Sequence, residues 1–568
     1  MSTWFARRTL DLVGVLVDVY YTRKYGTMAR RLGRPQASPA RRRGFIIIQI
    51  DGLSYDHLMQ ALAAGYMPHL SRLLAERSLA VSPWRCGLPS TTPAVQAGIM
   101  FGNRFDIPGF RWYEKERGQV MTARRPDDVQ TMRARISRGH PGILRGGSCY
   151  VSIFDGDADL ALFTLSALNP HRFFESARGM GLFLLFLLSP FRVLRVLGLT
   201  TKGYLVNLGR RLVALARPSV LSPLDLFSPL LHAASDALLT EAQTFGMMLD
   251  IYRRAPAIYA NYNSYDEAAH KLGPDHRAAF RVLQGVDKRI HQINRMCARY
   301  RRREYDLYIL SDHGNSPSVP FSWRSGASLG QHILAQIGAE LSVDERVDSY
   351  IQSEEKTRYL LDELRGLECR FAPRLRRVIA VARRYLGRRV LPSHPLDYDL
   401  GRQRDVVVSP SGPLAHVYFN ISPRPLDLIE VILLYPQLLN SLLADTGIGV
   451  LIGRAGERTV VMGHEGGTLV IGEGREAVEW PHPLAQFGDM SYAAAQIHRL
   501  AHFPHSGDLI VLGAVEPNGK VVTFEKQAGT HGGLGGPQGQ PFIAWPPERP
   551  LVSETLNDAQ DLYPYFML

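Results

Sequence analysis

Three short clusters of acidic and histidine residues in this chain have the composition of metal-binding sites. They lie far apart in the sequence, and with a threonine and a further histidine they make up the side-chain set of a two-metal hydrolase. Mixed carboxylate and imidazole ligands suit first-row divalent metals better than calcium, which prefers oxygen alone. We expect two divalent ions, zinc with manganese as the alternative. The candidate ligands are Asp51, Thr92, Asp266, His270, Asp312, His313 and His531.

The spacing of these residues predicts the elements that position them. Residues 45–50 and 306–310 are apolar and β-branched runs that predict buried strands. Asp51 directly follows the first run, and Asp312 follows the second after one intervening residue. Open α/β sheets carry their sites at the carboxyl ends of their strands. Asp266 and His270 are four apart and share one face if their segment is helical.

Thr92 precedes a proline and an apolar segment, residues 93–101, which predicts an N-cap at Thr92 and a helix that starts at Pro93. Its hydroxyl then lies where a helix N-terminus favours an anion. A free threonine hydroxyl is a weak nucleophile at neutral pH, and metal coordination is one way to activate it. Thr91 is the competing nucleophile.

In these motifs and their order, from residue 45 to about 547, the chain resembles the alkaline phosphatase superfamily, within it the type I phosphodiesterase/nucleotide pyrophosphatase branch. Each motif alone is weak, and five in order are specific. The motifs are Asp51-Gly52, Pro89-x-x-Thr92, Asp266-x-x-x-His270-x-x-Gly273-Pro274, Asp312-His313-Gly314 and Gly529-Thr530-His531-Gly532-Gly533.

The resemblance implies an alkaline-phosphatase-like α/β fold, a central mostly parallel sheet flanked by helices, with helical inserts. It implies one ion held by Asp51, Thr92, Asp312 and His313, and a second held by Asp266, His270 and His531. The two ions would clamp the attacking and leaving oxygens of an in-line displacement at phosphorus. The family places its nucleophile at the fourth position from Pro89, which favours Thr92 over Thr91.

One departure from the family concerns the substrate. The branch carries a turn with an asparagine that holds a phosphate oxygen, and the matching stretch here, residues 107–112, has none. The chain is also similar to a bacterial group of phosphatase-like proteins, a resemblance that supplies a fold and a site but no substrate. It rests on Gln96-Ala97-Gly98, on Phe110 to Gly118 and on Gly532 to Gln538.

Other polar residues are interpreted as structural. Asp155 and Asp157 are expected in a turn, and Glu114, Lys115 and Glu116 on a solvated rim. The remaining candidate histidines are interpreted as structural or surface groups: His464, His482, His502 and His505. No Cys/Ser-x-Pro-x-Arg segment marks a sulfatase at the nucleophile.

Composition is that of a globular enzyme: 568 residues, 45% apolar and 21% charged. Four cysteines with no CxxC pair indicate neither a disulfide framework nor a thiolate zinc site. Charged residues interrupt the N-terminal apolar stretch, so no signal peptide is predicted. We expect a cytoplasmic protein, peripheral on the inner face of the membrane in one interpretation.

That interpretation rests on how the net charge of +13 is distributed. Three acid-free basic segments, residues 23–43, 176–224 and 370–396, combine arginines with apolar residues, and the third has helical spacing. Such helices suit an anionic membrane surface. The alternative is that they cover an active-site mouth and attract anionic substrate. None is long enough to span a bilayer, and no nucleic-acid-binding motif is present.

The expected organisation is one elaborated α/β domain with insertions. Its portions are a basic amphipathic arm (1–44), a first core part (45–165), an apolar basic helical insert (166–235), a second core part (236–330), a helical insert (331–400) and a third core part (401–568).

The sequence thus predicts a metal-dependent phosphoester hydrolase, a phosphodiesterase rather than a monoesterase, acting through a phosphothreonine on an anionic phosphoester such as a lipid head group or nucleotide. One alternative is a phosphomonoesterase, phosphotransferase or mutase of the same superfamily. Another is a non-catalytic membrane-associated protein that retains the fold.

Overall fold

The computed structural model describes residues 43–167, 193–194, 196–201, 203–205, 209, 227–300, 303–338, 341–345, 405–472 and 475–567, without the side chains of 227–236 and 475. The basic arm expected over 1–44 and the inserts expected over 166–235 and 331–400 therefore lie mostly outside the described residues. No described helix combines the length and the apolar character needed to cross a membrane.

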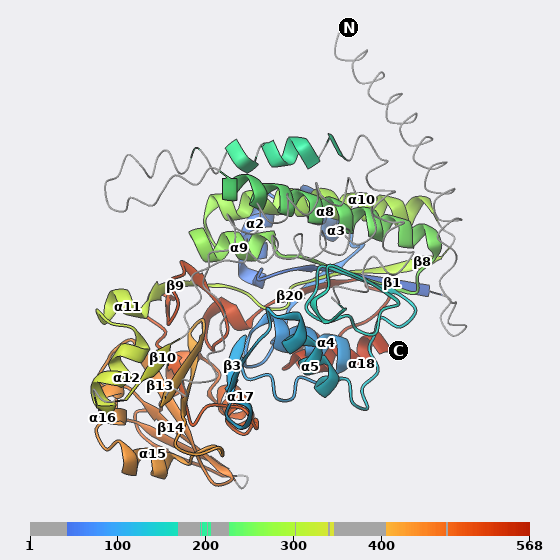
Figure 1. Ribbon diagram of the computed structural model, residues 1–568. Coiled ribbons are helices and arrows are strands. Elements are labelled where there is room, and N and C mark those ends of the chain that lie inside the picture. The colour runs from blue at the N-terminus through green and yellow to red at the C-terminus, as the bar shows by residue number, and fades with distance from the viewer. Residues whose placement is uncertain are drawn as a thin grey trace, which may run out of the picture.

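A seven-stranded, mostly parallel sheet forms the centre of the fold (Figure 1). Strands β8, β1, β7, β5 and β6 are parallel neighbours, whereas β20 runs antiparallel to β8 and to β2. This arrangement confirms the predicted α/β fold class. The strands, in spatial order, are β2 (Ala80–Pro83), β20 (Phe542–Trp545), β8 (Glu304–Leu310), β1 (Arg43–Ile50), β7 (Ala257–Tyr262), β5 (Ser148–Tyr150) and β6 (Leu160–Leu162).

Helices cover both faces of this sheet, which explains why β1 is apolar throughout. Ile46, Ile48 and Ile50 pack into the core on one face, and Phe45 and Ile47 into the core on the other. Each fully buried isoleucine contributes roughly 1.5–3 kcal/mol of transfer free energy, so β1 anchors the site it leads to. The helices are α2 (Tyr55–Ala63), α3 (Pro68–Ala75), α8 (Phe227–Arg253), α9 (Ser264–Leu272) and α10 (Arg277–Arg299) on one face, and α4 (Thr92–Phe101), α5 (Pro126–Ile136) and α18 (Leu562–Met567) on the other.

A second sheet of eight strands lies beside the first and is antiparallel except for its edge pair β10–β11. Helices α12 (Leu329–Ile337), α15 (Leu428–Leu434) and α16 (Leu438–Leu443) pack into the core on one of its faces, and α17 (Met490–Ala501) packs on the other. The third expected core part, 401–568, thus contributes to both sheets. The strands are β10 (Val343–Glu345), β11 (Val406–Ser411), β12 (Leu414–Phe419), β17 (Leu509–Gly513), β13 (Ile448–Ala455), β14 (Arg458–Gly463), β15 (Thr468–Gly472) and β16 (Arg475–Glu479).

Short elements join the two sheets near the carboxyl end of β8. Strand β9 (Ser316–Pro320) pairs with β18 (Val521–Thr523) and with β19 (Gly529–Thr530), which leads to His531. A hairpin of β3 (Arg111–Glu114) and β4 (Gln119–Thr122) lies against β11 of the second sheet. The candidate residues therefore converge where the two sheets meet.

Candidate active site

The ends of two neighbouring parallel strands deliver the first group of acids, as the sequence predicts. In the β1–β8 pairing, Gln49 lies opposite Leu310, so Asp51 and Asp312 both follow two residues beyond. The backbone N–H of Gly52 donates to Asp312 Oδ1 at 3.3 Å and ties the two strand ends together. Both aspartates are buried.

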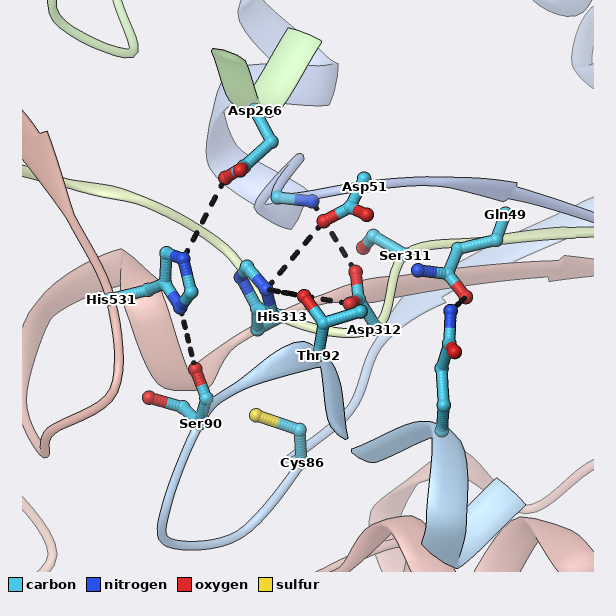
Figure 2. Close-up of polar contacts among 12 residues, drawn as sticks. Gln49, Asp51, Cys86, Ser90, Thr92, Asp266, Ser311, Asp312, His313 and His531 are labelled. Carbon is cyan, nitrogen blue, oxygen red and sulfur yellow. Dashed lines mark hydrogen bonds and ion pairs between the residues drawn. The ribbon is translucent and has the colours of Figure 1, made fainter. Parts of the chain in front are cut away.

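His313 is the centre of this first group (Figure 2). Its Nε2 lies 3.6 Å from Asp51 Oδ1 and 3.4 Å from Asp312 Oδ2. The hydroxyl of Thr92 reaches the same nitrogen at 3.1 Å. The four residues that the family resemblance assigns to one ion are therefore brought together from β1, β8 and the start of α4.

The second group comes from α9 and from the segment that follows β19. Asp266 and His270 lie on one face of α9, with His270 Nε2 3.2 Å from Asp266 Oδ2. His531 Nε2 lies 3.2 Å from His270 Nε2 and 3.8 Å from Asp266 Oδ1. The rings of His531 and His313 stack with centroids 3.7 Å apart, which places the two groups side by side.

Backbone carbonyls fix the orientation of all three imidazoles. Nδ1 of His313 contacts the carbonyl of Gly314 at 2.9 Å, Nδ1 of His270 that of Gly529 at 2.7 Å, and Nδ1 of His531 that of Ser90 at 3.0 Å. A carbonyl only accepts, so each Nδ1 carries a proton, and in the neutral ring each Nε2 keeps a lone pair for the site. This is the arrangement that metal-binding histidines adopt in proteins.

The donor set fits divalent cations. Asp51 Oδ1 and Asp312 Oδ2 are buried with no hydrogen-bond partner among the described residues, which is costly for carboxylate oxygens unless a cation lies near. The Nε2 atoms of His270 and His531 face each other at 3.2 Å with both Nδ1 atoms protonated, so in the neutral rings two lone pairs meet. A cation between such donors removes both penalties.

The electrostatics of the site point the same way. Burial and the carboxylates of Asp312 and Asp266 raise the pKa of Asp51 well above its usual range. Burial also raises the pKa of Asp312, against the opposing effect of His313. Burial opposes the charge of Asp266 as well, but the facing His270 outweighs it and lowers the pKa of Asp266. Burial, with His313 next, lowers the pKa of His531 well below its usual range.

Two asparagines that the sequence analysis does not identify orient the acids. Asn261, at the end of β7, donates to Asp51 Oδ2 at 2.7 Å and leaves Oδ1 for the site. Asn315 donates to the carbonyl of Gly52 at 3.0 Å and to Asp266 Oδ1 at 2.8 Å, so it links the two groups. Amides are not the preferred ligands of these ions, so residue type alone does not identify Asn261 and Asn315 as part of the site.

The helix that carries Thr92 begins one residue earlier than predicted. Helix α4 starts at Thr92, and Thr91 is its N-cap residue, although the Thr91 side chain makes no capping hydrogen bond. Thr92 is therefore the first helical residue rather than the cap, and it still lies at the helix N-terminus. The helix is held to β1 by Gln96, whose Nε2 donates to Gln49 Oε1 at 3.1 Å.

A pocket opens beside Thr92 between the two sheets, and its walls include residues that the sequence analysis does not select. Residues 107–112, where the family's asparagine is missing, contribute Phe110 and Arg111. Glu525 accepts from Arg111 Nη2 at 2.9 Å, and Arg124 lies over the ring of Phe110 at 5.2 Å. The lining residues are Thr91, Thr92, Phe110, Arg111, Arg124, His270, Ser411, Gly412, Glu525, Gln527 and His531.

The expectation of a solvated rim is wrong for Glu114 and Lys115. Glu114 is fully buried and accepts from Arg135 Nη1 at 2.6 Å. The Lys115 ammonium lies 2.7 Å from the buried Asp508. Both side chains point into the junction of the two sheets, where ion pairs compensate their burial, and sequence alone does not reveal such partners. Glu116 is exposed, as expected.

The residues interpreted as structural make structural contacts. Asp155 and Asp157 form ion pairs with Arg133. His464 Nδ1 bonds to the carbonyl of Leu443 and His502 Nδ1 to that of His498, whereas His482 Nδ1 accepts from the Leu484 amide. His505 lies between two carboxylates, those of Asp106 and Glu116.

Known structures of similar overall chain path include two hydrolases. Phosphonoacetate hydrolase from Sinorhizobium meliloti 1021, in complex with phosphonoacetate, is 15% identical with a TM-score of 0.45, over 92% of this chain and 95% of that one. Murine ectonucleotide pyrophosphatase/phosphodiesterase 5, an inactive variant in complex with AMP, is 12% identical with a TM-score of 0.38, over 89% and 87%. At this level of similarity the geometry of the site carries the functional argument.

No curated protein sequence matches the chain. Residues 206–370 match the model of the type I phosphodiesterase / nucleotide pyrophosphatase family. This segment contains Asp266, His270, Asp312 and His313. The resemblance predicted from the sequence motifs, to the type I phosphodiesterase / nucleotide pyrophosphatase family, is thereby confirmed in the segment that carries four of the seven candidate residues.

Proposed function

We propose that this protein is a metal-dependent phosphoester hydrolase of the phosphodiesterase type, with Thr92 as its nucleophile and a phosphothreonine as its intermediate. The family matched by residues 206–370 supports the reaction class. Asp51, Asp312 and His313 would hold one divalent ion with Thr92, and Asp266, His270 and His531 would hold the second.

One observation carries the proposal. Three imidazoles, each with Nδ1 bound to a backbone carbonyl, turn their Nε2 atoms toward three buried carboxylates around a single hydroxyl, that of Thr92. Among these donors, the Nε2 atoms of His270 and His531 face each other at 3.2 Å, and Asp51 Oδ1 and Asp312 Oδ2 have no hydrogen-bond partner among the described residues. This is the arrangement expected of metal ligands.

The chain's own residues account for the chemical steps. Thr92 Oγ loses its proton and bonds to phosphorus, while the bond from phosphorus to the departing oxygen breaks and the alcohol leaves with a proton. Water then attacks the phosphothreonine, so a phosphate monoester leaves and the Thr92 hydroxyl is restored. The position of Thr92 in the first turn of α4 favours the anionic forms of both hydroxyl and phosphate.

When bound, two divalent ions would lower the pKa of a coordinated hydroxyl and stabilise charge on the attacking and leaving oxygens. The protein's part is to hold the ligands in place. Asn261 and Asn315 fix the carboxylates, and three backbone carbonyls fix the imidazoles.

The pocket supports a diester over a monoester. Its lining includes Phe110, Arg124 and Gln527 beside Thr92 and the histidines, and we assign these residues to a second substituent of the phosphorus.

The test is a panel of chromogenic phosphate mono- and diesters assayed with the metal-free protein and with added zinc or manganese. We expect hydrolysis only in the presence of metal, with higher kcat/KM for diesters. Failure of every ester to react with either metal would refute the proposal. Added glycerol serves as a control for phosphotransferase activity, because a transferase would form a glyceryl phosphoester in place of the hydrolysis product.

A further inference from the structure

The wall of the pocket beside Thr92 contains two buried oxygen atoms that have no hydrogen-bond partner among the described residues. One is Oγ1 of Thr91, a residue only 1% exposed. The other is the amide oxygen of Gln527. Both residues line the same pocket as Thr92, His270 and His531. Buried polar atoms are usually paired. Other described residues also have unpaired buried atoms, but these two are oxygens on residues that line the pocket beside the proposed nucleophile.

The orientation of the Gln527 amide follows from its neighbour. Its Nε2 donates to Glu525 Oε2 at 2.8 Å, and a carboxylate only accepts, so the other amide atom must be the carbonyl oxygen. Glu525 is itself fixed by Arg111 Nη2 at 2.9 Å and by the Gly412 amide at 3.3 Å. The free atom of Gln527 is therefore an acceptor held in place by a buried ion pair.

Thr91 is fixed by the backbone around it. It is the N-cap residue of α4, in extended conformation, and its hydroxyl does not cap the helix. A Cβ added at Gly532 would lie 3.4 Å from Thr91 Cγ2, so the loop with His531 packs against this side chain. The Thr91 hydroxyl can both donate and accept.

We propose that the pocket binds a hydroxylated substituent of the phosphoester, a polyol rather than an alkyl or aromatic group, and that Gln527 and Thr91 determine this specificity. A substrate hydroxyl would donate to Gln527 Oε1, and a hydroxyl of the same substituent would pair with Thr91 Oγ1. Arg124 lies over the Phe110 ring at 5.2 Å, so that face of the ring is not open to a flat aromatic group. This inference rests on the proposed function and narrows its substrate.

The experiment compares two p-nitrophenyl phosphodiesters that share a leaving group. One carries a 2,3-dihydroxypropyl substituent and the other a propyl substituent. Leaving a buried polar group unpaired lowers affinity by roughly 10-fold or more, so we expect the metal-loaded protein to favour the dihydroxypropyl ester in kcat/KM by about that factor.

Two substitutions remove the oxygens with little change in shape. Gln527→Leu and Thr91→Val should each bring the ratio of the two kcat/KM values toward 1, and Thr91→Ser should restore it. Gln60→Leu, at an exposed glutamine on α2, is the matched control and should keep the wild-type ratio. A merely structural role would lower both esters alike and leave the ratio unchanged. Thermal unfolding checks that each variant is folded.

The outcomes separate this inference from the proposed function. If both esters are hydrolysed with a ratio near 1, or if Gln527→Leu leaves a high ratio intact, the specificity is refuted and the hydrolase stands. If neither ester is hydrolysed but other diesters of the panel are, the inference alone fails, and if no ester of the panel reacts, the proposed function fails as well. Soluble glycerophosphoglycerol and vesicles of phosphatidylglycerol then distinguish a free polyol ester from a lipid head group, and hydrolysis of neither would count against a polyol.

Discussion

At the scale of single residues, the proposed chemistry depends on Thr92, whose hydroxyl oxygen is the nucleophile. We expect Thr92→Ala to lower kcat by at least about 10³-fold, since a nucleophile cannot be replaced by a methyl group. Metal content should stay near that of the wild type, because the acids and histidines of both groups remain. Turnover assays and elemental analysis on the same preparation measure the two effects. If Thr91→Ala is inactive and Thr92→Ala is not, the nucleophile is Thr91.

The two histidine-containing groups predict the number of metal ions. The purified protein should bind about two divalent ions. His313→Ala and His531→Ala should each deplete a different one, because their Nε2 atoms belong to different groups. Elemental analysis after mild chelation gives the stoichiometry, and re-addition of metal should restore activity. One ion or none in an active preparation would rule out a two-metal mechanism.

Asn315 should affect metal binding without being a ligand. It donates to Asp266 Oδ1 and to the Gly52 carbonyl, so its loss frees a carboxylate of the second group. Substitution of such partners lowers metal affinity by about 10- to 100-fold, and we expect Asn315→Ala to do so. Competition with a chromophoric chelator measures the affinity directly, whatever the activity. An affinity equal to that of Gln60→Leu would contradict this role.

These residues also show which parts of a site can be predicted from sequence. Asp51, Asp312 and the Asp266/His270 pair could be predicted because strand ends and helical spacing fix where they point. Asn261 and Asn315 could not be predicted, since each amide acquires its role from a neighbour distant in sequence. Gln527 could not be predicted either, because its partner Glu525 is in turn fixed by Arg111, far away in the chain. The same holds for Glu114 and Lys115, whose ion-pair partners, Arg135 and Asp508, lie elsewhere in the chain.

At the scale of elements, His505 fastens the second sheet to the region that follows α4. It precedes β17, and its two ring nitrogens lie 2.5 Å from Asp106 and 2.6 Å from Glu116. Both partners are carboxylates, so both nitrogens donate and the ring is an imidazolium. Burial opposes this charge, but the hydrogen bonds to Asp106 and Glu116 outweigh it and raise the pKa of His505 to about 8.

This contact predicts a pH dependence of stability. The unfolded pKa of histidine is about 6.5, so the raised pKa contributes stability that is fully present below 6.5 and is lost as pH rises through about 8. In a chain of this size we expect a fall in Tm on the order of 1–2 °C between pH 6 and 9. His505→Gln should lower Tm at pH 6 and narrow its difference from the wild type at pH 9. Equal differences at both pH values would contradict the prediction.

The second sheet shows why element-level prediction stops where it does. Some of its strands could be predicted from short apolar runs such as residues 449–452 and 508–512, which overlap β13 and β17. Whether such runs join the central sheet or form another depends on pairings between distant strands, for example β12 with β17. The hydrophobic pattern within one strand does not indicate which other strand it pairs with.

At the scale of the whole molecule, the two sheets lie side by side, and a further helical region lies beyond the helices of the central sheet (Figure 1). Helical residues between 193 and 205 lie near α8 and α10, away from the second sheet. Val196 packs against the core of the central sheet, whereas Leu194, Leu197 and Leu205 are exposed. These leucines belong to a sequence segment, residues 176–224, that contains no acid and several arginines.

This arrangement leads to a prediction of membrane binding, in which exposed leucines and nearby basic residues face an anionic lipid surface together. Each basic side chain close to such a surface contributes about 1 kcal/mol, and residues 23–43, which lie almost entirely outside the described residues, add eight more. We expect the protein to float with anionic vesicles at low salt and to bind less at 1 M salt, where the Debye length falls to about 3 Å.

Leu194→Gln with Leu197→Gln should weaken the part of the binding that resists salt, because that part comes from apolar burial. Ile429→Gln with Leu433→Gln, two exposed positions on α15 of the second sheet, is the matched control and should leave flotation unchanged. If the wild type binds neutral vesicles equally well, or does not float at all, the arginines have another use, and attraction of an anionic substrate to the site becomes the better explanation of their charge.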